Sequence, residues 1–292
     1  MKIKKLLISL MKAAAYIGVF LGVQMAVTTL LTVGGILVLD MLYFSAGISI
    51  SNQALFENLL PAVTVLSCAV TLLLLWLFFA VRGKSFAREV RWHRLTSPGA
   101  AVLGPLECGF GLSIVSSFAM AMIPFPEAWY ASFDEANVLL LTGNALFQAF
   151  AAVIAAPILE EIVFRGLIYT RLCRGMKRWI AAILSAVLFG MVHGTLLALV
   201  YTIPMGLLLC LFYEKYRSLW APILLHMGFN LAGTVTEAFY DAPDSVMLLL
   251  AGIGLYLTVS GFVSMWVYRR DSGLYCKPVK KSRSVPSDAD NF

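Results

Sequence analysis

The sequence predicts an all-α protein, a polytopic bundle of about eight transmembrane helices with both termini in the cytoplasm. Hydrophobic residues make up 60% of the 292-residue chain, and charged residues only 13%. Long apolar runs recur from end to end, and a transmembrane helix needs about 20 mostly apolar residues. Because backbone groups inside a bilayer must find partners within the protein, and the runs lack the alternation of barrel strands, we expect helices.

The basic residues predict the topology. All 22 Lys and Arg residues fall in five clusters. The clusters lie at 2–12, 82–94, 165–178, 215–217 and 269–283. Only acidic residues, such as Glu127 and Asp244, occupy the loops between them. This is the positive-inside pattern, so the clusters are expected to face the cytoplasm and the net charge of +6 indicates no nucleic-acid partner.

The expected spans follow in order along the chain. They occupy about residues 13–39, 58–81, 100–124, 137–159, 179–197, 198–213, 219–236 and 246–268. Lys12 and the long run after it favour a retained first span over a cleaved signal peptide. Only 35 uncharged residues separate Arg178 from Glu214. They form either two short helices with a tight turn near Gly194, or one helix and a re-entrant segment, which would leave six spans and a hairpin.

These spans divide the chain into four parts. Residues 1–135 hold spans one to three, residues 136–240 hold a core of spans four to seven, residues 241–270 hold the last span, and residues 271–292 form a polar tail that we expect to be disordered. The five cysteines have no CxxC spacing, so they predict neither a disulfide framework nor a cysteine metal site.

Few ionisable residues interrupt the apolar runs. They are Glu107, Glu160, Glu161, His193 and His226, with Arg165 at an edge. A charged side chain at mid-bilayer costs at least ~2.5–3.5 kcal/mol, so such residues usually have a partner and a function. Glu107 stands apart from the others, and we expect it to be structural.

The spacing of these residues predicts shared helix faces. Glu161 and Arg165 are four residues apart, so they can pair, while Glu160 is rotated by ~100° and points elsewhere. Pro157 removes a helical hydrogen bond just upstream and can kink the span there. His226 and Asn230 are also four residues apart and leave the same face of the next-to-last span.

Together with His193, these side chains offer what hydrolysis requires: a base for water, proton carriers and a donor for an oxyanion. Each has a structural alternative as well. The pair of Glu161 and Arg165 could serve packing alone, and an intramembrane His or Asn is often interhelical glue worth ~0.6 kcal/mol. At ~1.5 Å per residue, His226 lies ~13 Å from the nearest basic cluster and His193 ~22 Å, so the two imidazoles are expected at different depths.

The three segments resemble motifs of one family. "EEIVFRG" matches EExxxR, "FGMVH" matches FxxxH and "HMGFN" matches HxxxN, in the order found in the CPBP family of CAAX proteases and bacteriocin-processing (Abi) enzymes. The resemblance covers about residues 140–235. It implies an intramembrane endopeptidase in which Glu160 and His193 activate water, Glu161 and Arg165 hold the motif in place, and His226 with Asn230 stabilises the oxyanion.

Two versions of that chemistry stay open. Glu160, His193 and His226 could hold Zn²⁺ with an open water position. Alternatively no metal takes part, which we favour because the chain has no HExxH helix. The expected partners are the lipid bilayer and a peptide or membrane-protein substrate, and the expected location is a bacterial inner membrane.

Two other classes of protein fit parts of the pattern. A non-catalytic scaffold or a bacteriocin-immunity partner would use the motif residues as interhelical glue. A proton-coupled transporter would use the glutamates as a relay, but it should show symmetry between its halves, and the sequence has none.

Overall fold

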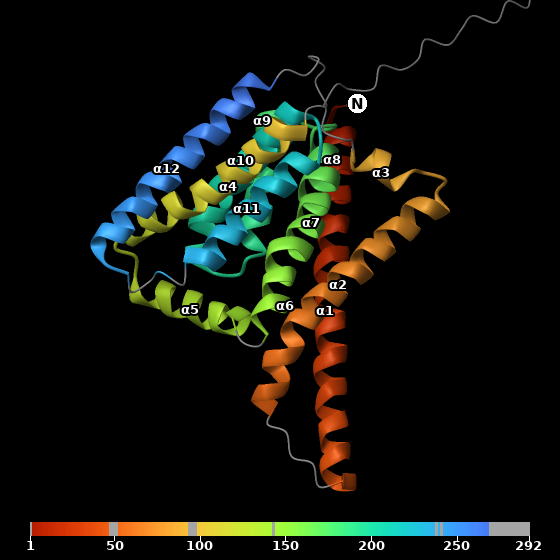
Figure 1. Ribbon diagram of the computed structural model, residues 1–292. Coiled ribbons are helices and arrows are strands. Elements are labelled where there is room, and N and C mark those ends of the chain that lie inside the picture. The colour runs from red at the N-terminus through yellow and green to blue at the C-terminus, as the bar shows by residue number, and fades with distance from the viewer. Residues whose placement is uncertain are drawn as a thin grey trace, which may run out of the picture.

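The computed structural model describes residues 2–46, 52–92, 98–141, 144–236, 239 and 242–268, and these form a helical membrane bundle (Figure 1). The tail expected at 271–292 lies outside the described residues. The predicted all-α class and the multi-pass membrane character are confirmed.

The helices follow one another with short connections. They are α1 (Lys2–Ala46), α2 (Asn52–Val81), α3 (Phe86–Glu89), α4 (Pro98–Ala121), α5 (Glu127–Leu141), α6 (Ala145–Ala149), α7 (Ala156–Glu161), α8 (Thr170–Leu172), α9 (Arg178–Met191), α10 (Leu196–Tyr216), α11 (Trp220–Thr236) and α12 (Asp244–Val267). Two π-helical segments, Phe150–Ala155 and Ile162–Tyr169, join α6, α7 and α8 into one continuous helix, Ala145–Leu172. We call this 28-residue element the motif helix.

Among the described residues, six helices are long and apolar enough to cross a membrane: α1, α2, α4, the motif helix, α10 and α12. The spans expected at 179–197 and 219–236 form the shorter helices α9 and α11, of 14 and 17 residues. At ~1.5 Å per residue, α9 is ~21 Å long and falls short of a ~30 Å hydrocarbon core. The count of eight full spans is therefore not confirmed. The tight turn near Gly194 is present, with φ +80° at that glycine.

The fourth span differs most from its expected bounds of 137–159. The motif helix begins later, after Asn144, whose side chain caps it by accepting from the backbone N–H of Phe147. It also ends later, at Leu172, because the charged residues that suggested an end near residue 159 have partners inside the bundle.

Small residues set how closely α4 packs between α11 and α12. A Cβ added to Gly109 of α4 would meet the carbonyl of Leu225 in α11, and one added to Gly228 of α11 would meet the carbonyl of Leu106 in α4. Gly261 of α12 likewise faces α4. Such stripes let membrane helices approach to backbone contact, where van der Waals packing replaces the hydrophobic driving force.

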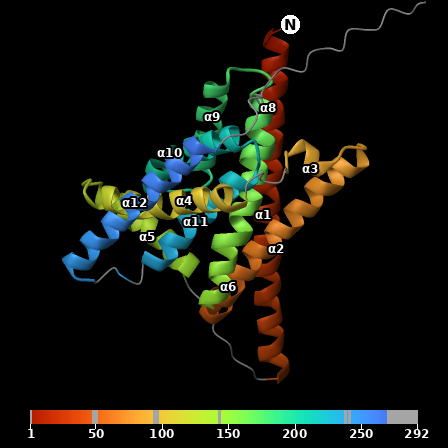
Figure 2. The same ribbon diagram turned by 45° about the horizontal axis from the view of Figure 1, so that its top comes forward.

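The long helix α1 runs beside the motif helix in both views (Figures 1 and 2). Its 45 residues span ~67 Å at 1.5 Å each, so its far end projects beyond the rest of the bundle. Phe20 of α1 meets Phe164 of the motif helix edge-on, with ring centroids 5.9 Å apart. The motif helix is thus held between α1 and the group of α9, α10 and α11.

Candidate functional site

The motif helix changes its winding on both sides of the two glutamates. The six residues of α7, which include Pro157, Glu160 and Glu161, lie between the two π-helical segments. Proline lacks an N–H and its ring crowds the carbonyl one turn earlier, and a π-helical turn accommodates both effects by widening the helix. Beside Pro157, where a kink is expected, the structure has π-helical winding, a feature that often occurs at functional sites.

Glu161 and Arg165 form the buried ion pair that their spacing predicts. Arg165 Nη1 donates to Glu161 Oε1 at 2.7 Å, and neither side chain has any exposed surface. The guanidinium also donates from Nη2 to the carbonyl of Gly206 in α10, at 3.2 Å. Its third contact is the ring face of Phe189 in α9, 4.3 Å from the guanidinium carbon to the centroid. One arginine therefore joins three helices.

His226 of α11 lies between the two carboxylates. Its Nδ1 is 2.9 Å from Glu161 Oε1, and its Nε2 is 3.7 Å from Glu160 Oε2. Because Glu161 is a carboxylate paired with Arg165, it accepts, and Nδ1 carries the hydrogen. The Nε2 atom is left to face Glu160 at a distance too long for a direct hydrogen bond.

The two carboxylates differ in access. The side chain of Glu160 keeps 19% of its surface exposed, whereas that of Glu161 keeps none. Glu161 Oε1 already accepts from Arg165 and His226. Glu160 is therefore the more accessible of the two carboxylates.

Phe189 brings the second imidazole to the same place. Its ring contacts that of His193 at 4.7 Å and that of His226 at 5.6 Å, both edge-on. His193 Nδ1 donates to the carbonyl of Phe189 at 2.7 Å, which leaves its Nε2 free to act as an acceptor. Among the contacts of the described residues, His193 has no hydrogen bond or ion pair with Glu160.

Asn230 contacts the motif helix about two turns before the glutamates. Its Nδ2 donates to the carbonyl of Ala152 at 2.8 Å, inside the first π-helical segment, where a carbonyl is released from the regular pattern. The amide has a second N–H, so this bond does not use its whole donor capacity.

The zinc alternative requires Glu160, His193 and His226 to converge on one point. Within the ranges that the structure describes, no three His, Cys, Asp or Glu side chains gather closely enough to hold a metal ion. As they lie in this structure, these three residues do not fit a zinc site.

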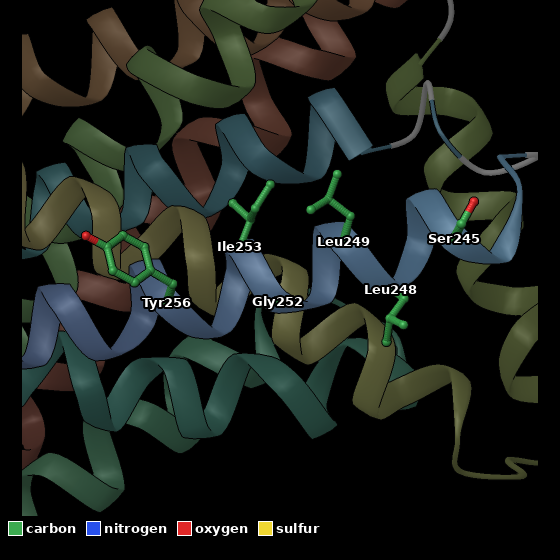
Figure 3. A pocket seen from close by; sticks show the side chains of 6 residues that line it. All are labelled: Ser245, Leu248, Leu249, Gly252, Ile253 and Tyr256. Atoms are coloured by element: carbon green, nitrogen blue, oxygen red, sulfur yellow. The ribbon is translucent and has the colours of Figure 1, made fainter.

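Glu107 lies outside this group. It accepts a hydrogen bond from Ser260 at 3.1 Å, between α4 and α12. A separate cavity of about 510 Å³ lies along α12, lined by Leu248, Leu249 and Tyr256 among others (Figure 3). Its lining comes from one helix that is mostly exposed, so it is part of a lipid-facing surface, not of the site.

Sequence reasoning missed one functional partner, the carbonyl of Gly206. A backbone carbonyl has no residue type, so nothing in the sequence could indicate it. The residue type at position 206 is consistent with this close contact, because a Cβ there would lie 2.9 Å from Ala186 Cα and 3.4 Å from Arg165 Nη2.

The family comparison matches the segment that holds the site. A family model described as "Type II CAAX prenyl endopeptidase Rce1-like" matches residues 142–232. The "Putative membrane peptidase YdiL" of Bacillus subtilis is 31% identical over 109 residues, which are 36% of this chain and 44% of the relative. The "UPF0177 protein YbdI" of Lactococcus lactis is 32% identical over 80 residues, 27% of this chain and 42% of the relative.

This chain thus spans less than half the length of either relative. No solved structure gives a significant match. The matched segment contains all three motifs and every residue of the site described above. That segment is similar to the Rce1-like family, and the resemblance predicted from the motifs is confirmed.

Proposed function

We propose that the protein is a CAAX-type intramembrane endopeptidase of a bacterial cell membrane, which hydrolyses a peptide bond of a membrane-associated protein or peptide. The observation that carries the proposal is the arrangement of His226 between a buried carboxylate, Glu161, and an accessible one, Glu160. The family match and the "Putative membrane peptidase" relative support it.

In the proposed mechanism Glu160 is the general base. It takes a proton from a water molecule whose oxygen attacks the scissile carbonyl, with His193 as the second acceptor for that water. The separation of 3.7 Å between Glu160 Oε2 and His226 Nε2 leaves the two groups unbonded, so that both can contact the reacting atoms.

His226 and Asn230 are proposed to stabilise the oxyanion. In its doubly protonated form, His226 keeps its Nδ1–H bond to Glu161 and can donate from Nε2 to the developing negative charge. When the tetrahedral intermediate collapses, the C–N bond breaks and Glu160 returns its proton to the leaving amine. Glu161 and Arg165 are positioning residues, because they hold His226 and the motif helix without reaching the reacting atoms.

The test is cleavage of a quenched fluorescent peptide library by the purified full-length protein in detergent. Glu160→Gln and His193→Ala should each lower cleavage by at least ~100-fold while the protein stays folded, since a general base contributes 10²–10⁴. Glu107→Gln is the matched control, an intramembrane glutamate away from the site, and should retain activity.

Cleavage by the wild type and by each variant is measured with and without a chelator, which tests the zinc alternative. Equal cleavage by the wild type and Glu160→Gln would place the activity elsewhere. A non-catalytic scaffold would then be the better explanation of the motifs.

A further inference from the structure

A second cavity lies away from the motif residues, where two spans end. It has a volume of about 410 Å³. Its lining includes Lys84, Arg88, Glu89, Arg91, Thr170 and Arg174. The candidate span of α2 ends at Val81 and the motif helix ends at Leu172, so the cavity lies beside the ends of two candidate spans. We call it the basic pocket.

The charges of the basic pocket are not balanced. Four cationic side chains line it, from Lys84, Arg88, Arg91 and Arg174, against one carboxylate, Glu89. That carboxylate is already engaged, because its Oε2 accepts from Arg171 Nη2 at 2.5 Å. Lys84 Nζ is 4.0 Å from its other oxygen. The pocket therefore has an excess of positive charge.

The pKa of Arg174 reflects the same excess of positive charge. Burial, and then the positive charge of Arg171, lower the pKa of Arg174 below its ordinary value. An anion in the pocket would relieve the repulsion between these groups.

The segment that carries three of the cations is fixed to the motif helix. Val90 is fully buried, and a Cβ on Gly166 would lie 3.0 Å from its side chain. Trp92 meets Trp220 of α11 edge-on, with centroids 5.0 Å apart. Between these anchors Arg91 has φ +58°, a left-handed conformation that is unfavourable for a non-glycine residue and is common at functional sites. The backbone that carries Lys84, Arg88 and Arg91 is therefore anchored by packing contacts on both sides of Arg91.

We propose that the basic pocket binds a phosphate group, and that this phosphate belongs to the headgroup of an anionic phospholipid in the surrounding leaflet. Arginine presents a planar set of donors that matches phosphate oxygens, and basic pockets between transmembrane helices on the cytoplasmic side are suited to anionic headgroups. The ends of α2 and the motif helix place the pocket at the level of such headgroups.

The experiment measures lipid binding by the full-length protein in a neutral detergent. Phosphatidylglycerol, phosphatidylcholine or inorganic phosphate is titrated in, and bound molecules are counted by native mass spectrometry. The wild type should retain phosphatidylglycerol in preference to phosphatidylcholine. The double variant Arg88→Gln/Arg174→Gln should bind phosphatidylglycerol about 25-fold more weakly, since each basic group near an anionic surface is worth about fivefold.

The matched control is Lys4→Gln/Lys5→Gln, which removes the same charge from the exposed start of α1 and should change binding by less than about twofold, because those lysines do not line the pocket. Thermal unfolding is recorded for each variant. If Arg88→Gln/Arg174→Gln unfolds early, Arg88→Lys/Arg174→Lys keeps the charge but loses the planar donors, and it should bind phosphatidylglycerol more weakly than the wild type does.

Equal retention of both lipids, or equal losses in the pocket and control variants, would overturn the proposal. Pocket-dependent binding of inorganic phosphate without phosphatidylglycerol would uphold the phosphate site and reject the lipid as its source. Pocket-dependent binding of neither phosphate species would reject the site as proposed. None of these outcomes depends on proteolysis.

Discussion

Arg165 links the ion pair of the motif helix to the neighbouring helices, and its removal should affect more than one contact. Its guanidinium meets Glu161, the carbonyl of Gly206 and the ring of Phe189. Arg165→Met keeps the length of the side chain but leaves the carboxylate of Glu161 with His226 alone. Breaking a buried pair on one side costs about 3–5 kcal/mol, because the remaining charge stays desolvated.

The expected result is a large fall in the unfolding temperature of Arg165→Met in detergent. The double variant Glu161→Gln/Arg165→Met should recover part of it, because the uncompensated charge is then gone. If the two substitutions are additive, Arg165 acts through packing and not through the charge of Glu161.

At this scale the sequence predicted the pair of Glu161 and Arg165, because four residues along a helix fix their proximity. It could not predict that His226 reaches both glutamates, since that depends on how α11 packs against the motif helix. The expected depths, ~13 Å for His226 and ~22 Å for His193, also assumed upright helices. Both imidazoles instead contact the single ring of Phe189.

At the scale of the helices, Gly206 lets α10 pack closely against α9 and Arg165. Gly206→Ala would place a methyl group 2.9 Å from Ala186 Cα in α9 and 3.4 Å from Arg165 Nη2. Because backbone cannot move aside as a flexible side chain does, we expect a loss of roughly 1–3 kcal/mol. Gly252→Ala in α12 is the matched control, with open space around it, and should gain up to ~1 kcal/mol from helix propensity.

Thermal unfolding of both glycine variants in the same detergent measures the difference. If the protein is a peptidase, Gly206→Ala should also displace Arg165. The variant protein that remains folded should then cleave substrate more slowly than the wild type. Equal stability of the two variants would mean that α9 and α10 separate easily at this point.

The short helix α3 is fixed to the end of the motif helix by Glu89 and Arg171. Burial acts to raise the pKa of Glu89, but the hydrogen bond and the charge of Arg171 outweigh it and leave the pKa lowered. A carboxyl group whose pKa is lowered by folding contributes stability above its unfolded pKa of about 4.3, and that stability is lost as the pH falls through the folded pKa.

Glu89→Gln should therefore lower stability by about 1 kcal/mol at pH 7, a value reduced for partial exposure of the pair. The difference in unfolding temperature from the wild type should shrink as the pH falls below about 4. Glu135→Gln, at an exposed position in α5, is the control and should show no such trend. A difference that persists at low pH would mean that shape, not charge, fixes α3.

For the whole molecule, the charge pattern and the helix lengths give different counts of crossings. Six described helices are long enough to span, whereas α9 and α11 are short. Yet α9 begins at the basic residue Arg178 and α10 ends beside Arg217, so the two form a hairpin that starts and finishes on the basic side and turns at Gly194. The sequence could place these charges, but helix length depends on caps and packing that composition does not encode.

The topology itself can be tested with single cysteines on a background without native ones. Lys5→Cys and Lys177→Cys should react with a membrane-impermeant maleimide only after permeabilisation, because they lie in basic clusters expected to face the cytoplasm. Glu127→Cys and Asp244→Cys begin α5 and α12 in acidic loops and should react on intact cells. If Lys177→Cys reacted from outside while Lys5→Cys did not, the motif helix would run in the opposite direction to the one expected. The basic pocket, which contains Arg174, would then face the outer leaflet, and the positive-inside rule would fail for this chain.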